Sequence, residues 1–202
     1  MVEVVGNTII LKGYDALKLR KWMIIPVVLL VMVMGFGGVL LIKAQQEKAL
    51  LKKFNLSNTN IVEMVDKLEG IEEGLLNATI NTEFVVINDG DTTVKVRIPE
   101  DKFFLAFAPY INETKPCSEY NLTTCQGELA NQTFLVEVVS PNGDPILEQE
   151  MTSLENGFVS IWLDKDIEAN LIVTYNNLKA SAFITTFDDS NTCITTPLQL
   201  TK

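Results

Sequence analysis

One stretch of 21 residues, Trp22–Ile42, contains no charged side chain. A helix needs about 20 apolar residues to cross the hydrocarbon core of a bilayer, so this stretch predicts a transmembrane helix. It is longer than the roughly 7–15-residue apolar core of a cleaved signal peptide, and it lacks an Ala-x-Ala cleavage site. We therefore interpret it as an uncleaved signal anchor, with residues 1–21 as a cytoplasmic N-terminal segment.

The chain after this anchor is expected to lie outside the cytoplasm. Basic residues before the anchor are clustered more tightly than those after it, which favours a cytoplasmic N-terminus. Five Asn-x-Ser/Thr sequons follow, and such acceptors are used on the outer side of membranes. They are Asn55, Asn77, Asn112, Asn121 and Asn131. The sequence thus predicts a single-pass protein of the cell membrane with a glycosylated, extracytoplasmic C-terminal domain.

The charge of this domain excludes one class of partner. Residues Ala44–Lys202 carry 11 Lys and Arg against 24 Asp and Glu, a net charge of −13. Because an acidic surface repels phosphates, we exclude nucleic-acid binding. The acidic surface itself is most simply a solvated one that keeps the domain soluble.

Residues 43–81 are expected to be helical. Lys43–Phe54 has the charged, Ala/Leu/Lys-rich composition of a stalk. Asn60 then precedes Glu63 by three residues, as in an N-terminal capping box. An apolar helical face follows at the spacing i, i+3, i+4 and i+7, formed by Ile61, Met64, Val65 and Leu68. Met64 is a soft sulfur donor, but this spacing favours a core residue.

Residues 82–202 show the short, β-branched runs of strands. Asp89-Gly90 between two runs is a hairpin signal, which outweighs a calcium loop made of Asn88, Asp89 and Asp91. The predicted strands are Glu83–Asn88, Thr92–Ile98, Lys102–Ile111, Thr133–Ser140, Ile146–Met151, Phe158–Leu163, Asn170–Tyr175 and Ala180–Phe187. We predict a mainly β fold with a small N-terminal helical part (α+β), in which the β domain is antiparallel and sandwich-like. Its core should contain Phe103, Phe104, Phe107 and Trp162.

The chain has no histidine, so its three cysteines are the candidate residues for metal binding or redox chemistry. Ser-His-Asp and Cys-His catalytic arrangements are therefore excluded. One reading pairs Cys117 with Cys125 in a disulfide and leaves Cys193 over. The other brings all three thiolates together, which suits the soft ion Cu(I) better than Zn(II), since zinc needs a fourth ligand. The second reading requires a C-terminal strand that brings Cys193 beside the Cys117–Cys125 loop.

Residues around all three cysteines resemble the CueP family of periplasmic copper-binding proteins. The resemblance is carried by Ala108-Pro-Tyr-Ile-Asn-Glu-Thr114, Cys117, Leu122-Thr-Thr-Cys-Gln-Gly-Glu-Leu-Ala-Asn131, Asn156-Gly-Phe-Val159, Trp162-Leu163, Thr192-Cys-Ile-Thr-Thr196 and Leu198-Gln-Leu200. It implies a β-rich fold that dimerises through its N-terminal helical part. It also implies that Cys117, Cys125 and Cys193 bind copper and reduce Cu(II) to Cu(I), in copper tolerance or copper delivery.

The chain departs from this family pattern in two respects. Lys115 and Tyr120 stand where the pattern places histidine near the first cysteine, and this chain is predicted to be tethered rather than soluble. The missing imidazoles leave a three-sulfur Cu(I) site intact. The alternative function is a non-catalytic, glycosylated β-sandwich surface module, stapled by a Cys117–Cys125 disulfide.

Overall fold

A computed structural model of the chain describes residues 38, 40–72 and 74–202. Most of the predicted anchor, residues 22–42, lies outside these residues. No helix within the described ranges is both long and apolar enough to cross a bilayer. The chain divides into two units, Met1–Ala49 and Leu50–Lys202. In the first unit, the described residues 40–49 are helical, and Leu40, Leu41 and Ile42 expose their side chains.

The second unit begins with two helical segments, residues 50–53 and α2 (Ile61–Glu69). The Asn60 side chain caps α2, because its Oδ1 accepts a hydrogen bond from the Glu63 backbone N–H at 2.9 Å. Met64, Val65 and Leu68 are buried, which confirms the predicted apolar face and the core position of Met64. Gly70 follows as the C-cap.

We expect Asn60→Ala to destabilise the protein by about 1 kcal/mol, because the Glu63 N–H loses its acceptor at the end of α2. Denaturant unfolding of the full chain measures the change. Asn60→Asp is the matched control, since aspartate keeps a capping oxygen and should leave stability unchanged. Equal losses in both variants would contradict the capping role.

A four-stranded sheet follows α2 in the order β3-β2-β1-β5. Its strands are β1 (Asn77–Ile80), β2 (Phe84–Asn88), β3 (Thr93–Arg97) and β5 (Tyr120–Asn121). The β2–β3 hairpin is confirmed, with Gly90 at φ +100° and the Asp89 carboxylate accepting from the Thr92 N–H at 3.0 Å. The Asp89 side chain thus closes a turn, as the hairpin interpretation requires.

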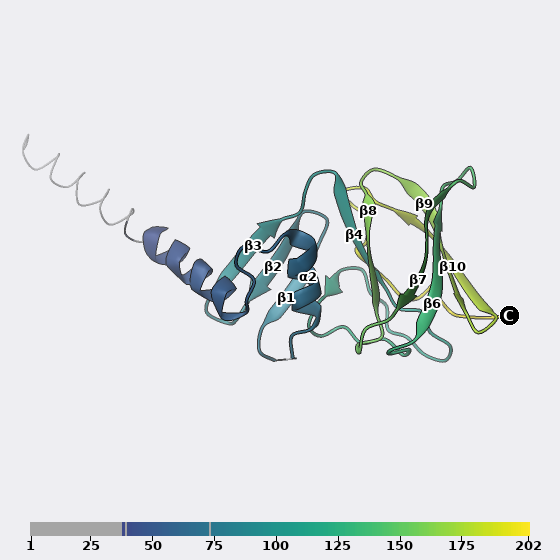
Figure 1. The fold of residues 1–202 in the computed structure, drawn as a ribbon, viewed down its shortest axis with the longest axis horizontal. Coiled ribbons are helices and arrows are strands. Elements are labelled where there is room, and N and C mark those ends of the chain that lie inside the picture. The colour runs from purple at the N-terminus through teal and green to yellow at the C-terminus, as the bar shows by residue number, and fades with distance from the viewer. Residues whose placement is uncertain (1–37, 39, 73) are drawn as a thin grey trace, which may run out of the picture. The chain divides into compact units, whose positions relative to one another are not determined.

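The remaining strands form two sheets that face each other, in the orders β10-β9-β6-β7 and β11-β4-β8 (Figure 1). These strands are β4 (Lys102–Phe107), β6 (Thr133–Val139), β7 (Pro145–Thr152), β8 (Val159–Asp164), β9 (Glu168–Tyr175), β10 (Leu178–Thr185) and β11 (Cys193–Ile194). Pairing between the named strands is antiparallel except between β11 and β4, and an isolated parallel bridge joins Tyr110 to Gln199. The mainly β, antiparallel fold class is therefore confirmed.

Strand β4 is a wall shared by two hydrophobic cores. Its odd-numbered residues Phe103, Leu105 and Phe107 belong to the core between the two facing sheets. Phe104 and Ala106 point the other way, into a core with α2 and the β3-β2-β1-β5 sheet. This explains why β4 is apolar at consecutive positions, since a strand buried on both faces does not alternate. The predicted burial of the three phenylalanines is confirmed, whereas Trp162 is only half-buried against Phe104.

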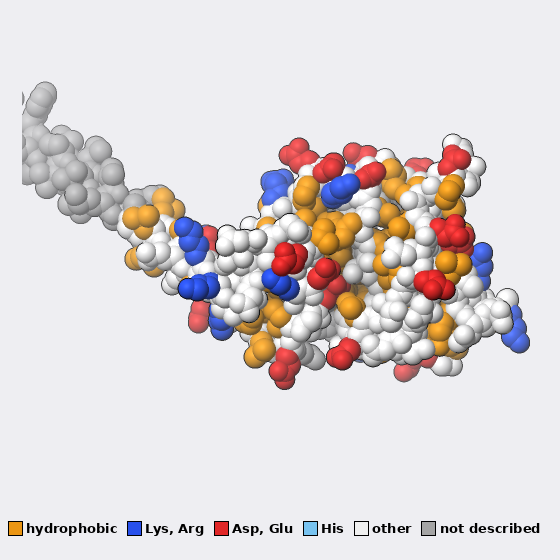
Figure 2. Space-filling view, viewed as in Figure 1, with side chains coloured by type: hydrophobic (Ala, Val, Ile, Leu, Met, Phe, Trp, Pro, Cys, Tyr) orange, Lys and Arg blue, Asp and Glu red, His pale blue; other side chains and the backbone are white. Residues whose placement is uncertain are grey.

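Acidic side chains are spread over the face of the protein seen in Figure 2. Figure 2 shows Asp and Glu side chains scattered over the visible face among uncharged ones. Several of them are paired with lysine, including Asp164 with Lys102 at 2.8 Å and Asp188 with Lys165. This distribution is typical of a solvated surface.

Candidate copper-binding thiol site

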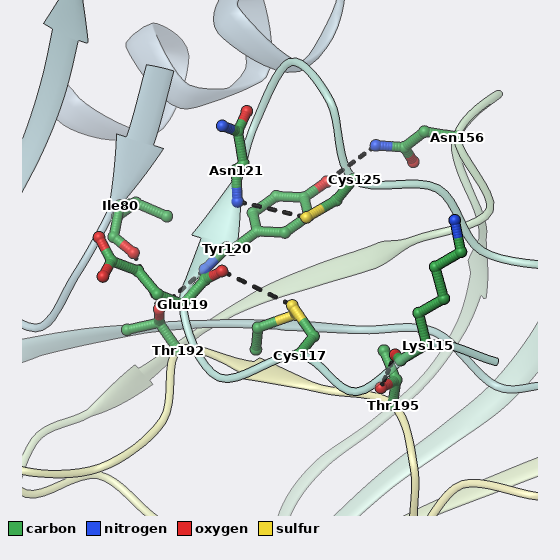
Figure 3. Close-up of a disulfide and its surroundings, with 11 residues drawn as sticks. Ile80, Lys115, Cys117, Glu119, Tyr120, Asn121, Cys125, Asn156, Thr192 and Thr195 are labelled. Carbon is green, nitrogen blue, oxygen red and sulfur yellow. Dashed lines mark hydrogen bonds between the residues drawn. A yellow bond between two sulfur atoms is a disulfide. The ribbon is translucent and has the colours of Figure 1, made fainter. Parts of the chain in front are cut away.

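Cys117 and Cys193 form a disulfide, and Cys125 is a free thiol (Figure 3). The Cα atoms of the bonded pair lie 5.3 Å apart, although the two residues are 76 positions apart in sequence. The alternative reading, which pairs Cys117 with Cys125, is therefore wrong. Sequence proximity suggested it, but the C-terminal strand places Cys193 nearer to Cys117.

Strand β11 brings Cys193 to this position. It pairs in parallel with β4, with Cys193 opposite Ala106. The Ala106 N–H donates to the Thr192 carbonyl at 2.9 Å, and the Cys193 N–H donates to the Ser118 carbonyl at 3.3 Å. The expectation that a C-terminal strand returns Cys193 to the cysteine loop is confirmed. Since Cys193 is fully buried there, the bond also fastens the loop to the core.

The free thiol of Cys125 is half-buried at the end of the same loop. Its Sγ accepts a hydrogen bond from the Asn121 N–H at 3.4 Å. The Asn121 side chain shapes the turn between them, because its Oδ1 accepts from the N–H groups of Thr123 and Thr124, each at 3.0 Å. Burial raises the pKa of the Cys125 thiol, against the opposing effect of the Asn121 N–H.

The three cysteines share one hydrophobic core. Cys193 is part of the core formed with α2 and β1–β3, and Cys117 and Cys125 pack against that core. In this disulfide state, the described part of the chain holds no group of three Cys, Asp or Glu side chains arranged to bind a metal ion. The fold thus gathers the predicted residues, but two of them are joined to each other.

Tyr120 occupies the middle of this arrangement, a role that no local sequence pattern predicted. Its side chain is fully buried, and its hydroxyl accepts from the Asn156 Nδ2 at 2.9 Å. Its backbone N–H donates to the Thr192 Oγ1 at 3.3 Å, next to Cys193. Burial and the nearby charge of Glu69 raise the pKa of Tyr120 far above its ordinary value, so the phenol stays protonated.

Glu69, the last residue of α2, is the second ionisable group in this region. Its Oε2 accepts from the Ser160 hydroxyl at 3.2 Å, while its buried Oε1 has no hydrogen-bond partner among the described residues. Burial raises the pKa of Glu69 from 4.5 to about 7; Tyr120 and Ser160 oppose this, and the charge of Asp66 adds to it. The carboxyl is therefore largely protonated below neutral pH.

A cleft of about 680 Å³ opens beside this pair. Its walls include Glu69 and Gly70 from the end of α2, together with Thr123 and Gln126 on either side of Cys125. Glu72, Glu155 and Asn156 complete its polar lining. Glu69 and the segment that carries Cys125 thus line the same cleft.

Lys115 and Tyr120, which we expected to stand where the family pattern places histidine, have roles in holding the loop. The Lys115 carbonyl accepts from the Thr195 hydroxyl at 2.6 Å and ties the cysteine loop to the C-terminal segment. The buried, protonated Tyr120 phenol packs between Phe104 and Phe158. The structure thus explains how the chain uses both positions without imidazole.

Three of the five predicted sequons, at Asn77, Asn112 and Asn121, have side chains that already form hydrogen bonds. The Asn121 Nδ2 donates to the Asn77 Oδ1 at 2.7 Å, and the Asn112 Nδ2 donates to the Glu128 carboxylate at 2.6 Å. A glycan on the Asn112 or Asn121 nitrogen would replace one of its two hydrogens and add bulk at these contacts. Asn121 also shapes the Cys125 turn, so its amide has a local structural role.

Comparison with known proteins points to one family. The family described as periplasmic copper-binding protein CueP matches residues 60–199. A solved structure described as the crystal structure of S.CueP is 36% identical, with a TM-score of 0.73. That match covers 76% of this chain and 96% of the other. No protein with a curated description matches at a significant level.

Proposed function

Since the chain belongs to the CueP family of periplasmic copper-binding proteins, we propose that it holds Cu(I) on the thiolates of Cys117, Cys125 and Cys193. The observation that carries this proposal is the position of the odd cysteine. Cys125 remains a thiol on the loop that begins at Cys117, and that loop is bonded to Cys193. Reduction of the disulfide would release two further thiols against the same core.

Thiolates suit this ion for a chemical reason. Cu(I) is soft and prefers sulfur, and a thiolate is the binding form of cysteine. Because the chain has no histidine, no imidazole competes with these sulfurs. Metal binding must displace thiol protons, so retention of Cu(I) should weaken as the pH falls.

We further propose that the reduced protein converts Cu(II) to Cu(I). The Cys117 and Cys193 thiolates close to a disulfide and release two electrons, which reduce two Cu(II) ions to two Cu(I) ions. Cys125 stays reduced in this step, so it remains available as a Cu(I) ligand while the other two cysteines are oxidised. An external dithiol must then reduce the Cys117–Cys193 disulfide before another cycle. Support for this division of roles comes from the pair that the structure shows bonded and the cysteine that it shows free.

The proposed setting is the outer side of a membrane. Residues 22–42 would anchor the chain there, and the helical part at residues 43–81 would support a homodimer. Leu40, Leu41 and Ile42 are exposed on the helix at residues 40–49, where apolar side chains suit a bilayer or a second copy. Protease treatment of intact cells should remove the domain from Ala44 onward, and protection of the domain would refute this topology.

We expect Cys193→Ser to lower Cu(I) retention and to abolish reduction of Cu(II), because the variant loses one ligand and the partner of Cys117. The full chain is reduced with dithiothreitol, which is then removed without oxygen. Bound Cu(I) per chain is measured by competition with a Cu(I)-specific chelator. Cys125→Ser should lower retention while the Cys117–Cys193 pair still reduces Cu(II).

Thr124→Ala is the matched control, since Thr124 is an exposed neighbour of Cys125 and contributes only its backbone to the loop. It should bind Cu(I) as the wild type does. Wild-type retention in Cys193→Ser would refute a shared three-sulfur site. A reduced wild-type chain that binds no Cu(I) would instead favour the surface-module alternative, with its staple moved to Cys117 and Cys193.

A further inference from the structure

Two hydrogen bonds join Asn121 to Cys125 and enclose the turn between them. The Asn121 N–H donates to the Cys125 Sγ at 3.4 Å, and the Cys125 N–H donates to the Asn121 carbonyl at 3.2 Å. Figure 3 shows the first of these contacts, with the amide group of Asn121 on the side away from the sulfur. The backbone of the turn therefore determines where the sulfur lies.

The Asn121 side chain closes this turn. Its Oδ1 accepts from the N–H groups of Thr123 and Thr124 and from the Thr123 hydroxyl, each at 3.0 Å. Asparagine suits this place because its side chain can bond to the backbone two and three residues further on. Thr123 is buried, so its N–H would be left without an acceptor if the amide were removed. The amide of Asn121 thus holds the chain on the path that leads to Cys125.

The turn is fastened to β1, a strand that contains no cysteine. The Asn121 Nδ2 donates to the Asn77 Oδ1 at 2.7 Å, and the Leu122 N–H donates to the Ala78 carbonyl at 2.8 Å. The Leu122 side chain is buried in the core beside this strand. The attachment of the turn therefore consists of hydrogen bonds and apolar packing.

The disulfide is attached to a different part of the fold. Cys193 lies on β11, which pairs with β4, and its bond to Cys117 does not include the turn. Reduction of that bond thus removes none of the contacts that hold Cys125.

We propose that Asn121 is a positioning residue for copper binding, which holds the Cys125 sulfur as the fixed ligand of the site whether the Cys117–Cys193 disulfide is closed or open. The inference rests on the proposed function in that Cys125 binds Cu(I). It adds that one of the three ligands is placed before the metal arrives, and it identifies the residue that places it. Residues that orient a metal ligand commonly lower affinity by about 10–100-fold when they are replaced.

Hydrogen exchange of the full chain tests the positioning without copper. Exchange is followed by mass spectrometry on a peptide spanning residues 118–127. In Asn121→Ala, the N–H groups of Thr123 and Thr124 should exchange about tenfold faster, because each loses its acceptor. Asn121→Asp should exchange as the wild type does, since aspartate keeps that acceptor and the Asn77 amide can turn to donate to its second oxygen.

Reduction of the wild type with dithiothreitol should leave the exchange of these two N–H groups unchanged. Faster exchange after reduction would mean that the turn depends on the disulfide, which would overturn the proposal. Asn121→Gln places its amide one carbon further from the backbone and should lose the same bonds as Asn121→Ala. It replaces Asn121→Ala if that variant does not fold.

Competition with a Cu(I)-specific chelator then measures Cu(I) affinity in the reduced chain at neutral pH. We expect Asn121→Ala to bind Cu(I) about 10–100-fold more weakly than the wild type, and Asn121→Asp to restore the wild-type affinity. Asn81→Ala is the matched control. The Asn81 Oδ1 accepts from the N–H groups of Glu83 and Phe84 at 2.9 and 2.8 Å, so this variant loses the same pair of bonds in the turn between β1 and β2.

Wild-type Cu(I) affinity in Asn121→Ala would overturn the positioning role. An equal loss in Asn81→Ala would do the same, because the cause would then be a general loss of stability. A wild-type chain that binds no Cu(I) would refute the proposed function instead, while the exchange measurements would still decide whether Asn121 holds the Cys125 turn.

Discussion

Gly157→Ala should destabilise the protein by about 2–5 kcal/mol. A Cβ at Gly157 would lie 2.6 Å from the Gly127 carbonyl oxygen and 2.7 Å from its carbonyl carbon. These are backbone atoms, so no side chain can move aside, and overpacking of this kind costs about 1–3 kcal/mol. Gly157 also has φ +78°, and the left-handed region adds about 1–2 kcal/mol for alanine. Denaturant unfolding of the full chain measures the sum.

Gly143→Ala separates these two contributions. Gly143 has φ +88°, but nothing lies within 4 Å of a Cβ built there. The control should therefore lose only the conformational part, about 1–2 kcal/mol. If the free energy of unfolding falls equally in both variants, the short distance between Gly127 and Gly157 adds nothing to the cost of a Cβ at Gly157. Because Gly127 follows Cys125 by two residues, that approach also fixes one end of the thiol segment.

Most strands of the fold were predictable because their signals are local. The β2–β3 hairpin was predicted from Asp89-Gly90, and the alternating pattern of β6 follows from its inward residues Phe134, Val136 and Val138. Strand β1 was missed because Asn77-Ala-Thr-Ile is short and begins with a turn-forming residue. Its strand character comes from pairing with β2 on one side and β5 on the other, which no local pattern reveals.

The residues of the candidate site could be predicted from the sequence, but the disulfide pairing among them could not. Three cysteines in a chain without histidine indicate sulfur chemistry by composition alone. Which two meet depends on β11, a strand of only two residues held by its register on β4. Cysteine spacing contains no information about that register, so the shorter loop from Cys117 to Cys125 favoured the wrong pair.

The partial burial of Glu69 could not be predicted for a different reason. It is the final residue of an amphipathic helix, a position where carboxylates usually face water. Its burial results from Tyr120 and Ser160, which are distant in sequence and come from β5 and β8. A half-buried acid with one buried oxygen can be recognised only once the tertiary contacts are known.

Glu69→Gln should make the protein more stable than the wild type by about 3 kcal/mol at pH 8, and equally stable near pH 4.5. The folded chain holds the Glu69 proton up to about pH 7, whereas an unfolded carboxyl releases it near 4.5. Between these values the unfolded state binds fewer protons, so wild-type stability falls as the pH rises, by about 1.4 kcal/mol per pH unit from this group. Above pH 7 the loss is complete and the contribution becomes flat.

Glutamine has no proton to lose, so the difference between the two unfolding free energies isolates Glu69 from every other titrating group. Guanidinium unfolding at several pH values from 4.5 to 8 gives that difference. Glu63→Gln is the matched control, because Glu63 lies on the same helix with an exposed side chain paired to Lys67. Its difference from the wild type should stay below about 1 kcal/mol throughout. A Glu69→Gln difference that does not change between pH 4.5 and pH 8 would mean that the pKa of Glu69 is not raised in the folded protein.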